Sequence, residues 1–152
     1  MWRVQLTSQF RGIEIAMWEY GEVAVLATEL FQNRKYSSPR AAWDAAADQL
    51  LATPSLREKN CPRTTFLSLC QDGLVVGIPM GNYTRAKENK EYAIEAVRQL
   101  VRKPVLADLS PDDLWQIVIG GREVVPNSQM HVVLTLWKRS LIAQDRVSQV
   151  YS

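Results

Sequence analysis

The sequence predicts a mainly α-helical protein, with about six helices arranged as two similar three-helix units in one compact domain. Apolar residues recur every three or four positions through most of the chain, which is the pattern of amphipathic helices. Ser-Pro pairs stand before two of these segments, at Ser38-Pro39 and Ser110-Pro111, and are typical helix starts. Several landmarks also recur 67 to 72 residues further along the chain. A short N-terminal arm precedes the two units.

Composition places the chain among ordinary globular proteins. Its 152 residues are 47% apolar and 22% charged, which excludes a disordered tail and a disulfide-rich miniprotein. A chain of this length hides roughly 70% of its unfolded surface, enough for one core. No apolar run approaches the ~18 residues of a membrane span. Charged residues in the first twenty positions predict that no signal peptide is present, and we expect a cytoplasmic protein.

The first half is predicted to hold an arm and three helices. In residues 1–19, Val4 and Leu6 alternate with polar neighbours, as in a short edge strand or a loosely docked arm. A first helix covers Glu22 to Gln32, and a second begins at Ser38-Pro39. A third begins at Asn60 and ends at Gly73, which fits the left-handed residue that closes a helix. The expected core residues of the second and third helices are Trp43, Ala47, Leu50, Leu51, Phe66, Leu67, Leu69 and Cys70.

The second half repeats this plan after a loop. Residues 74–83 contain two glycines and a proline and predict a loop or a short extended segment. A fourth helix is expected from about Arg85 to Lys103, and a fifth from Ser110-Pro111 to Gly120-Gly121. Asn127-Ser128 caps a sixth, whose buried stripe is Met130, Val133, Leu134 and Trp137. The residues after Ile142 resemble a frayed tail.

The recurring landmarks suggest an internal duplication. Ser38-Pro39 with Trp43 matches Ser110-Pro111 with Trp115, and Leu74-Val75 matches Leu141-Ile142. Asn60 likewise falls on Asn127. We therefore divide the chain into an arm (1–19), a first trihelical unit (20–76), a connecting loop (77–88), a second trihelical unit (89–143) and a tail (144–152). The alternative is that helical proteins simply reuse the same caps and leucines.

Cysteine and histidine chemistry finds little support. Cys61 and Cys70 lie nine residues apart on one predicted helix, about 13 Å, which is too far for a disulfide. Cys61 in a first helical turn could be nucleophilic, although a packing role is the commoner one. His131, the only histidine, is expected to be half exposed on its helix. Two cysteines and one histidine without close pairing do not make a zinc site, so we expect neither a metal nor a cofactor.

The charge distribution points to the centre of the chain as an anion-binding region. Net charge is −2 over residues 1–33, +5 over 34–103 and −1 over 104–152. The candidate residues for binding nucleic acid or another anion are Arg63, Thr84, Arg85, Lys87 and Lys90, with Arg34, Lys35 and Arg40 as a second cluster. The loop 73–87 lacks the P-loop and dinucleotide fingerprints, and a plain linker is its alternative. A solvated charged face is the alternative for the basic residues.

Two classes of function remain open. We expect a non-catalytic binding protein that acts on nucleic acid, or on a protein partner or a second copy of itself. Exposed aromatic residues favour interfaces, so Trp2, Phe10 and Trp18 are the candidate partner surface. The alternative is a small enzyme or an anionic-ligand-binding protein that uses the 73–87 loop and Cys61.

The stretch CPRTTFLSLCQDGLVVGIPMGNYTRAKENKEYAIEAVRQL resembles the core of a family of small bacterial proteins known only as a domain of unknown function. Segments like SPRAAWDAAADQL and NSQMHVVLTLW flank it in that family. The resemblance spans about residues 20–142 and leaves the arm outside. It implies a bacterial or phage-borne intracellular protein, and it carries over no activity, cofactor or catalytic residue.

Overall fold

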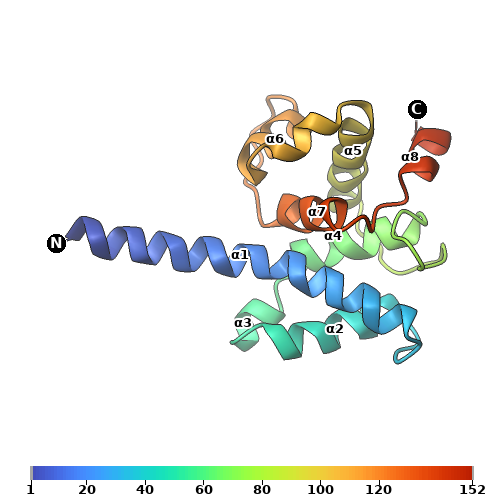
Figure 1. Ribbon diagram of the computed structural model, residues 1–152, viewed down its shortest axis with the longest axis horizontal. Helices are drawn as coiled ribbons and strands as arrows, with labels where there is room; N and C mark the ends of the chain where they lie inside the picture. Colours follow the sequence, from blue (N-terminus) through green and yellow to red (C-terminus); the bar gives the residue numbers. More distant parts are fainter. Residues whose placement is uncertain (1, 152) are drawn as a thin grey trace.

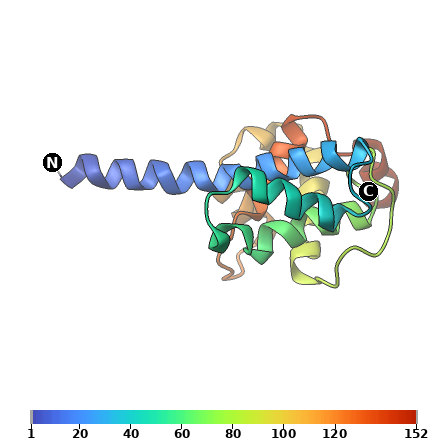
Figure 2. The same cartoon turned by 90° about the horizontal axis from the view of Figure 1, so that it is seen from below.

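The computed structural model describes the backbone of residues 2–151 and the side chains of residues 12 and 14–151. It confirms a mainly helical protein in which one long helix, α1, extends out of a compact bundle (Figure 1). Figure 2, which is turned by 90°, also shows α1 extending from the bundle. Within residues 2–151, no helix has both the length and the apolar character that a membrane crossing needs.

The predicted N-terminal strand is wrong. α1 runs without interruption from Trp2 to Gln32, so residues 2–19 continue the first helix instead of forming an extended arm. The alternation at Val4 and Leu6 covered too few positions to outweigh the helical pattern that follows. The C-terminal part of α1 is buried among other helices, and its buried residues include Tyr20, Val23, Ala24 and Ala27.

The rest of the first unit follows the predicted helix starts. α2 spans Pro39–Leu50, and the Ser38 hydroxyl accepts a hydrogen bond from the Ala41 amide at 3.1 Å. Leu50 was expected in the core but is 40% exposed, while Leu51 is buried. A short helix that the pattern did not predict, α3, covers Pro54–Arg57. α4 spans Asn60–Gln71, and Gly73 has the expected positive φ of 72°.

The second unit repeats these devices. α5 spans Glu88–Arg102 and leads through a 3₁₀ turn, η1 (Pro104–Asp108), to α6 at Pro111–Ile119. The Ser110 hydroxyl accepts from the Asp113 amide at 3.1 Å, and Gly120 closes α6 in the left-handed conformation. α7 spans Gln129–Lys138. Ser128 precedes it with φ 66°, yet its hydroxyl is buried without a partner among the described residues, so the expected side-chain cap is absent.

The C-terminal segment is a helix and not a frayed tail. α8 spans Gln144–Tyr151 and packs on α5. Val147 is buried between them, while Arg98 Nε donates to the Tyr151 carbonyl at 2.9 Å. The sequence pattern missed α8 because Val147 is its one buried residue among those described, and one buried residue produces no helical periodicity.

The two units meet through reciprocal contacts. Val75 and Ile142, which the sequence matched, face each other in an antiparallel bridge. The Val76 amide donates to the Leu141 carbonyl and the Ala143 amide to the Leu74 carbonyl, both at 2.9 Å. Helix packing is crossed in the same way, because α1 packs on α2 and α7 whereas α5 packs on α6 and α4. These relations agree with the internal duplication that the sequence suggests.

Candidate functional site

An open cavity of about 600 Å³ lies along the N-terminal turns of α5. Four of the five residues predicted to bind an anion line it, namely Thr84, Arg85, Lys87 and Lys90. Gln71, Ala86, Glu91, Ile94, Glu95 and Arg98 complete the wall. We call this hollow the α5 cavity. Its volume lies within the range typical of sites for small molecules.

Helical geometry explains why these side chains converge. Lys87, Lys90, Ile94 and Arg98 recur at spacings of three and four residues, which places them on one side of α5. The opposite side of the helix is buried in the core through Tyr92, Ala93, Ala96, Val97 and Leu100. The chain before the helix, residues 84–86, forms the remaining edge of the cavity.

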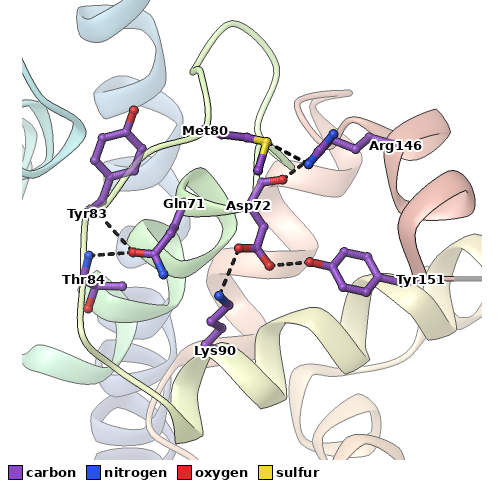
Figure 3. A network of polar contacts seen from close by, with 8 residues as sticks. All are labelled: Gln71, Asp72, Met80, Tyr83, Thr84, Lys90, Arg146 and Tyr151. Carbon is purple, nitrogen blue, oxygen red and sulfur yellow. Dashed lines mark hydrogen bonds and ion pairs between the residues drawn. The ribbon is translucent and has the colours of Figure 1, made fainter.

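Gln71 fixes the loop that forms this edge. Its side-chain oxygen accepts hydrogen bonds from the Tyr83 amide at 3.0 Å and the Thr84 amide at 3.1 Å (Figure 3). The Thr84 hydroxyl then accepts from the Ala86 amide at 3.1 Å. Because side chains satisfy the amides of Tyr83, Thr84 and Ala86, the segment is held in position beside Lys87 without belonging to a helix.

Lys90 is tied to a second network at the back of the cavity. Its ammonium lies 3.0 Å from a carboxylate oxygen of Asp72, whose other oxygen accepts from the Tyr151 hydroxyl (Figure 3). Arg146 donates to the Asp72 carbonyl at 2.7 Å. Burial, together with the hydrogen bond from the Tyr151 hydroxyl to the Asp72 carboxylate, raises the pKa of Tyr151 to about 12. The C-terminal helix is therefore docked through the same carboxylate that holds Lys90.

The charges of the α5 cavity are unequal along its length. Arg85 and Lys87 are exposed and form no ion pair with any residue that the structure describes. Further along α5, Glu95 pairs with Arg98 at 3.1 Å, and Glu91 lies 3.3 Å from Arg122. The cationic end is thus the end at residues 84–87, where two positive side chains, a hydroxyl and the start of a helix lie together.

The fifth predicted residue, Arg63, lies apart from the α5 cavity. It is on α4, where it pairs with Asp44 at 3.5 Å and donates to the Asn60 side chain. The structure therefore does not bring Arg63 together with the other four residues, and its charge joins α4 to α2. Arg40, from the second basic cluster, does approach the site, because it donates to the Tyr83 carbonyl at 3.3 Å.

The cysteines and the histidine show no constellation of groups for catalysis in the described residues. Both cysteines are free thiols, and burial raises the pKa of Cys70 well above its usual range. Cys61 is half-buried, and its carbonyl accepts from the Thr65 hydroxyl at 2.8 Å. His131 was expected to be half exposed but is only 5% exposed. Burial lowers its pKa to about 4.

The structure describes the side chain of one residue of the predicted partner surface. Trp18 is half-buried and packs with its ring centroid 4.8 Å from that of His131, while Lys138 lies over its face. It therefore serves the packing of α1 on α7, and its role in a partner surface stays a prediction. Trp2 and Phe10 lie outside the side chains that the structure describes.

Sequence reasoning missed Gln71, Asp72 and Arg98. Gln71 and Asp72 end α4, a place where polar residues are ordinary, and only the folded chain brings them to the loop and to Lys90. Arg98 gave a usable signal, since it lies eight positions after Lys90 on the same predicted helix face.

The fold and the cavity define a small helical protein with a basic hollow beside α5. Residues 17–143 match the model of a family described as a family of unknown function (DUF6979). The chain belongs to this family, which confirms the resemblance seen in the sequence and extends it by a few residues at its N-terminal end. No curated protein and no solved structure gives a significant match.

Proposed function

We propose that the protein is a non-catalytic binding protein whose α5 cavity holds a phosphate-bearing ligand. The observation that carries this proposal is the convergence of Thr84, Arg85, Lys87 and Lys90 on one hollow, with the Arg85 and Lys87 side chains facing no carboxylate partner among the described residues. Guanidinium and ammonium groups beside a hydroxyl are the usual recognition set for phosphate oxygens.

The start of α5 adds to this preference. Lys87 occupies the N-cap position, and no side chain of the described residues caps the helix there. By contrast, α2 and α6 are capped by Ser38 and Ser110. The first amides of α5 therefore remain available beside Lys87, and together with the helix dipole they favour an anion.

The rest of the α5 cavity wall suits an uncharged part of the ligand better than a second phosphate group. Ala86 and Ile94 are apolar, and Glu91 and Glu95 place negative charge further along the helix. Phosphate is the shared chemistry of two sources, a free nucleotide and a nucleic acid strand. We also propose that the protein is cytoplasmic, since nucleotides and nucleic acids are both abundant there.

An amide-resolved NMR titration with inorganic pyrophosphate tests the site. We expect saturable shifts at residues 84–90, because the phosphate oxygens would lie against these amides. Shifts scattered over the basic surface, with no preference for this segment, would overturn the proposal. Parallel titrations with a nucleoside monophosphate and with a trinucleotide then separate the two sources of phosphate by which one binds more tightly.

A further inference from the structure

A second cation-lined cavity lies at the turn between α1 and α2. Its volume is about 760 Å³. The lining residues are the basic Arg34 and Lys35, the aromatic Phe31 and Tyr36, and Gln32, Ser37 and Gly77. No carboxylate is among these lining residues. Arg34 and Lys35 are exposed and form no ion pair within the described part of the chain. We call this hollow the turn cavity.

The backbone at Arg34 is unusual for a charged residue. Arg34 has φ 60°, and the bonds from its amide to Phe31 and from the Lys35 amide to Leu30 close α1 as a Schellman turn. Glycine is the favoured residue at this left-handed position because it has no Cβ, and α4 uses Gly73 there. At the equivalent position of α1 the residue is Arg34, and it lines the turn cavity.

One segment of chain joins the turn cavity to the α5 cavity. Gly77 lines the first and Thr84 lines the second, so at most about 25 Å of extended chain separates them. The segment is fixed at both ends, because Gln32 donates to the Val76 carbonyl at 2.8 Å and Gln71 accepts from Tyr83 and Thr84. Arg40 contacts this segment at the Tyr83 carbonyl. Figure 2 shows it running along the end of the bundle opposite the projecting part of α1.

The charges of this end are strongly one-sided. Residues 33–43 and 73–87 contain five basic residues, Arg34, Lys35, Arg40, Arg85 and Lys87, and no acidic residue. The rest of the chain holds 13 basic and 16 acidic residues. A chain that is nearly neutral overall thus concentrates positive charge on two neighbouring segments, and residues of these segments line part of both cavities.

We infer that this end of the molecule binds single-stranded nucleic acid, with one phosphate in the α5 cavity and others at the turn cavity. This inference rests on the proposed function and names its ligand. Arg34 and Lys35 beside Phe31 and Tyr36 give the combination of backbone neutralisation and aromatic surface that single strands use. Hollows suit unstacked nucleotides, whereas a duplex presents its phosphates on a rigid convex surface.

The test compares two double variants in the binding of a labelled oligodeoxythymidine of about 12 nucleotides, a length chosen to span both cavities. Arg34→Gly with Lys35→Ala removes both cations of the turn cavity, and glycine suits the left-handed position. Arg102→Ala with Lys103→Ala removes the same charge from the exposed far end of α5, about 20 Å along the helix. Fluorescence anisotropy is measured over a range of salt concentrations.

The turn-cavity variant is expected to bind about 25-fold more weakly at 0.1 M salt, with a salt slope smaller by about 1.4, the value for two lost phosphate contacts. The Arg102/Lys103 variant is expected to keep the wild-type slope. A trinucleotide, too short to reach both cavities, should bind the turn-cavity variant as it binds the wild type.

Three outcomes would overturn the inference: an unchanged slope in the turn-cavity variant, an equal loss in the Arg102/Lys103 variant, or equally tight binding of duplex DNA. None of these alters the pyrophosphate shifts at residues 84–90. The proposed function therefore stands or falls separately on that titration.

Discussion

The Lys90 ammonium and the Asp72 carboxylate lie 3.0 Å apart, so one cation of the α5 cavity is held by the network that docks the C-terminal helix. The proposed ligand binding and the docking of α8 thus share one carboxylate. A phosphate that attracts Lys90 competes with Asp72 for it, whereas Arg85 and Lys87 face no such competition from the described residues.

Replacing Asp72 with Asn separates these two roles. Without the carboxylate, Lys90 is released toward the cavity. We expect affinity for pyrophosphate to rise by up to about fivefold, since the ion pair of these half-buried side chains is worth on the order of 1 kcal/mol. The free energy of unfolding should fall by about 1–3 kcal/mol because the Tyr151 hydroxyl loses its charged acceptor. Calorimetric titration and urea unfolding measure the two effects. A loss of affinity would show that Lys90 needs Asp72 to be placed for binding.

Tyr151 predicts a loss of stability in strong alkali. Its pKa is raised from 10.0 to about 12, so the folded protein holds the phenol proton more tightly than the unfolded chain does. This contribution is complete below pH 10 and disappears as the pH rises toward 12. Tyr151→Phe should unfold with a weaker pH dependence across this window than the wild type. Identical pH dependences in urea unfolding would contradict the account of Tyr151.

His131 predicts a loss of stability in acid. Burial lowers its pKa from 6.5 to about 4, so the unfolded chain binds a proton that the folded protein excludes. Stability therefore falls as the pH drops from about 6.5 to 4, by about 2 kcal/mol between pH 7 and 5. His131→Phe keeps an aromatic ring against Trp18 and should remove this part of the pH dependence. If the variant loses as much stability as the wild type between those pH values, other groups dominate.

Gly21 marks the close crossing of α1 and α7. A Cβ at this position would lie 2.6 Å from the Cβ of Thr135 and 2.9 Å from the His131 carbonyl oxygen. We expect Gly21→Ala to destabilise the fold by about 1–3 kcal/mol through overpacking. Gly12, also in α1, is the matched control because a Cβ there would meet nothing within 4 Å. Gly12→Ala should leave thermal unfolding unchanged or raise its midpoint slightly, and equal losses in both variants would contradict the crossing as the cause.

The sequence predicted the helix starts well and the long-range partners poorly. Ser38, Ser110 and Gly73 act within one turn of their own positions, so their roles could be predicted locally. Arg63 was grouped with four residues that lie elsewhere, because its partner Asp44 is on another helix and no local pattern indicates that pair.

The sequence could predict the part of the candidate site that lies at the start of α5. Thr84, Arg85 and Lys87 precede α5 directly, and Lys90 follows within one turn, so their proximity followed from the predicted helix. Gln71 and Asp72 enter the site only through the return of the chain from α4. The exposure of His131 was predicted wrongly. The helix pattern placed it at the flank of the buried stripe, but Trp18 covers it, from the part of α1 that the sequence did not predict as helix.

The affinity of pyrophosphate for the wild type and for an Arg85→Ala, Lys87→Ala double variant is the most direct test of the α5 cavity. Both side chains are exposed and lie outside the core, so the variant is expected to keep the fold. Loss of two charged contacts should weaken binding by about tenfold or more, while the Arg102→Ala, Lys103→Ala control keeps wild-type affinity. Equal affinities in the wild type and the Arg85/Lys87 variant would contradict the assignment of the cavity as an anion site.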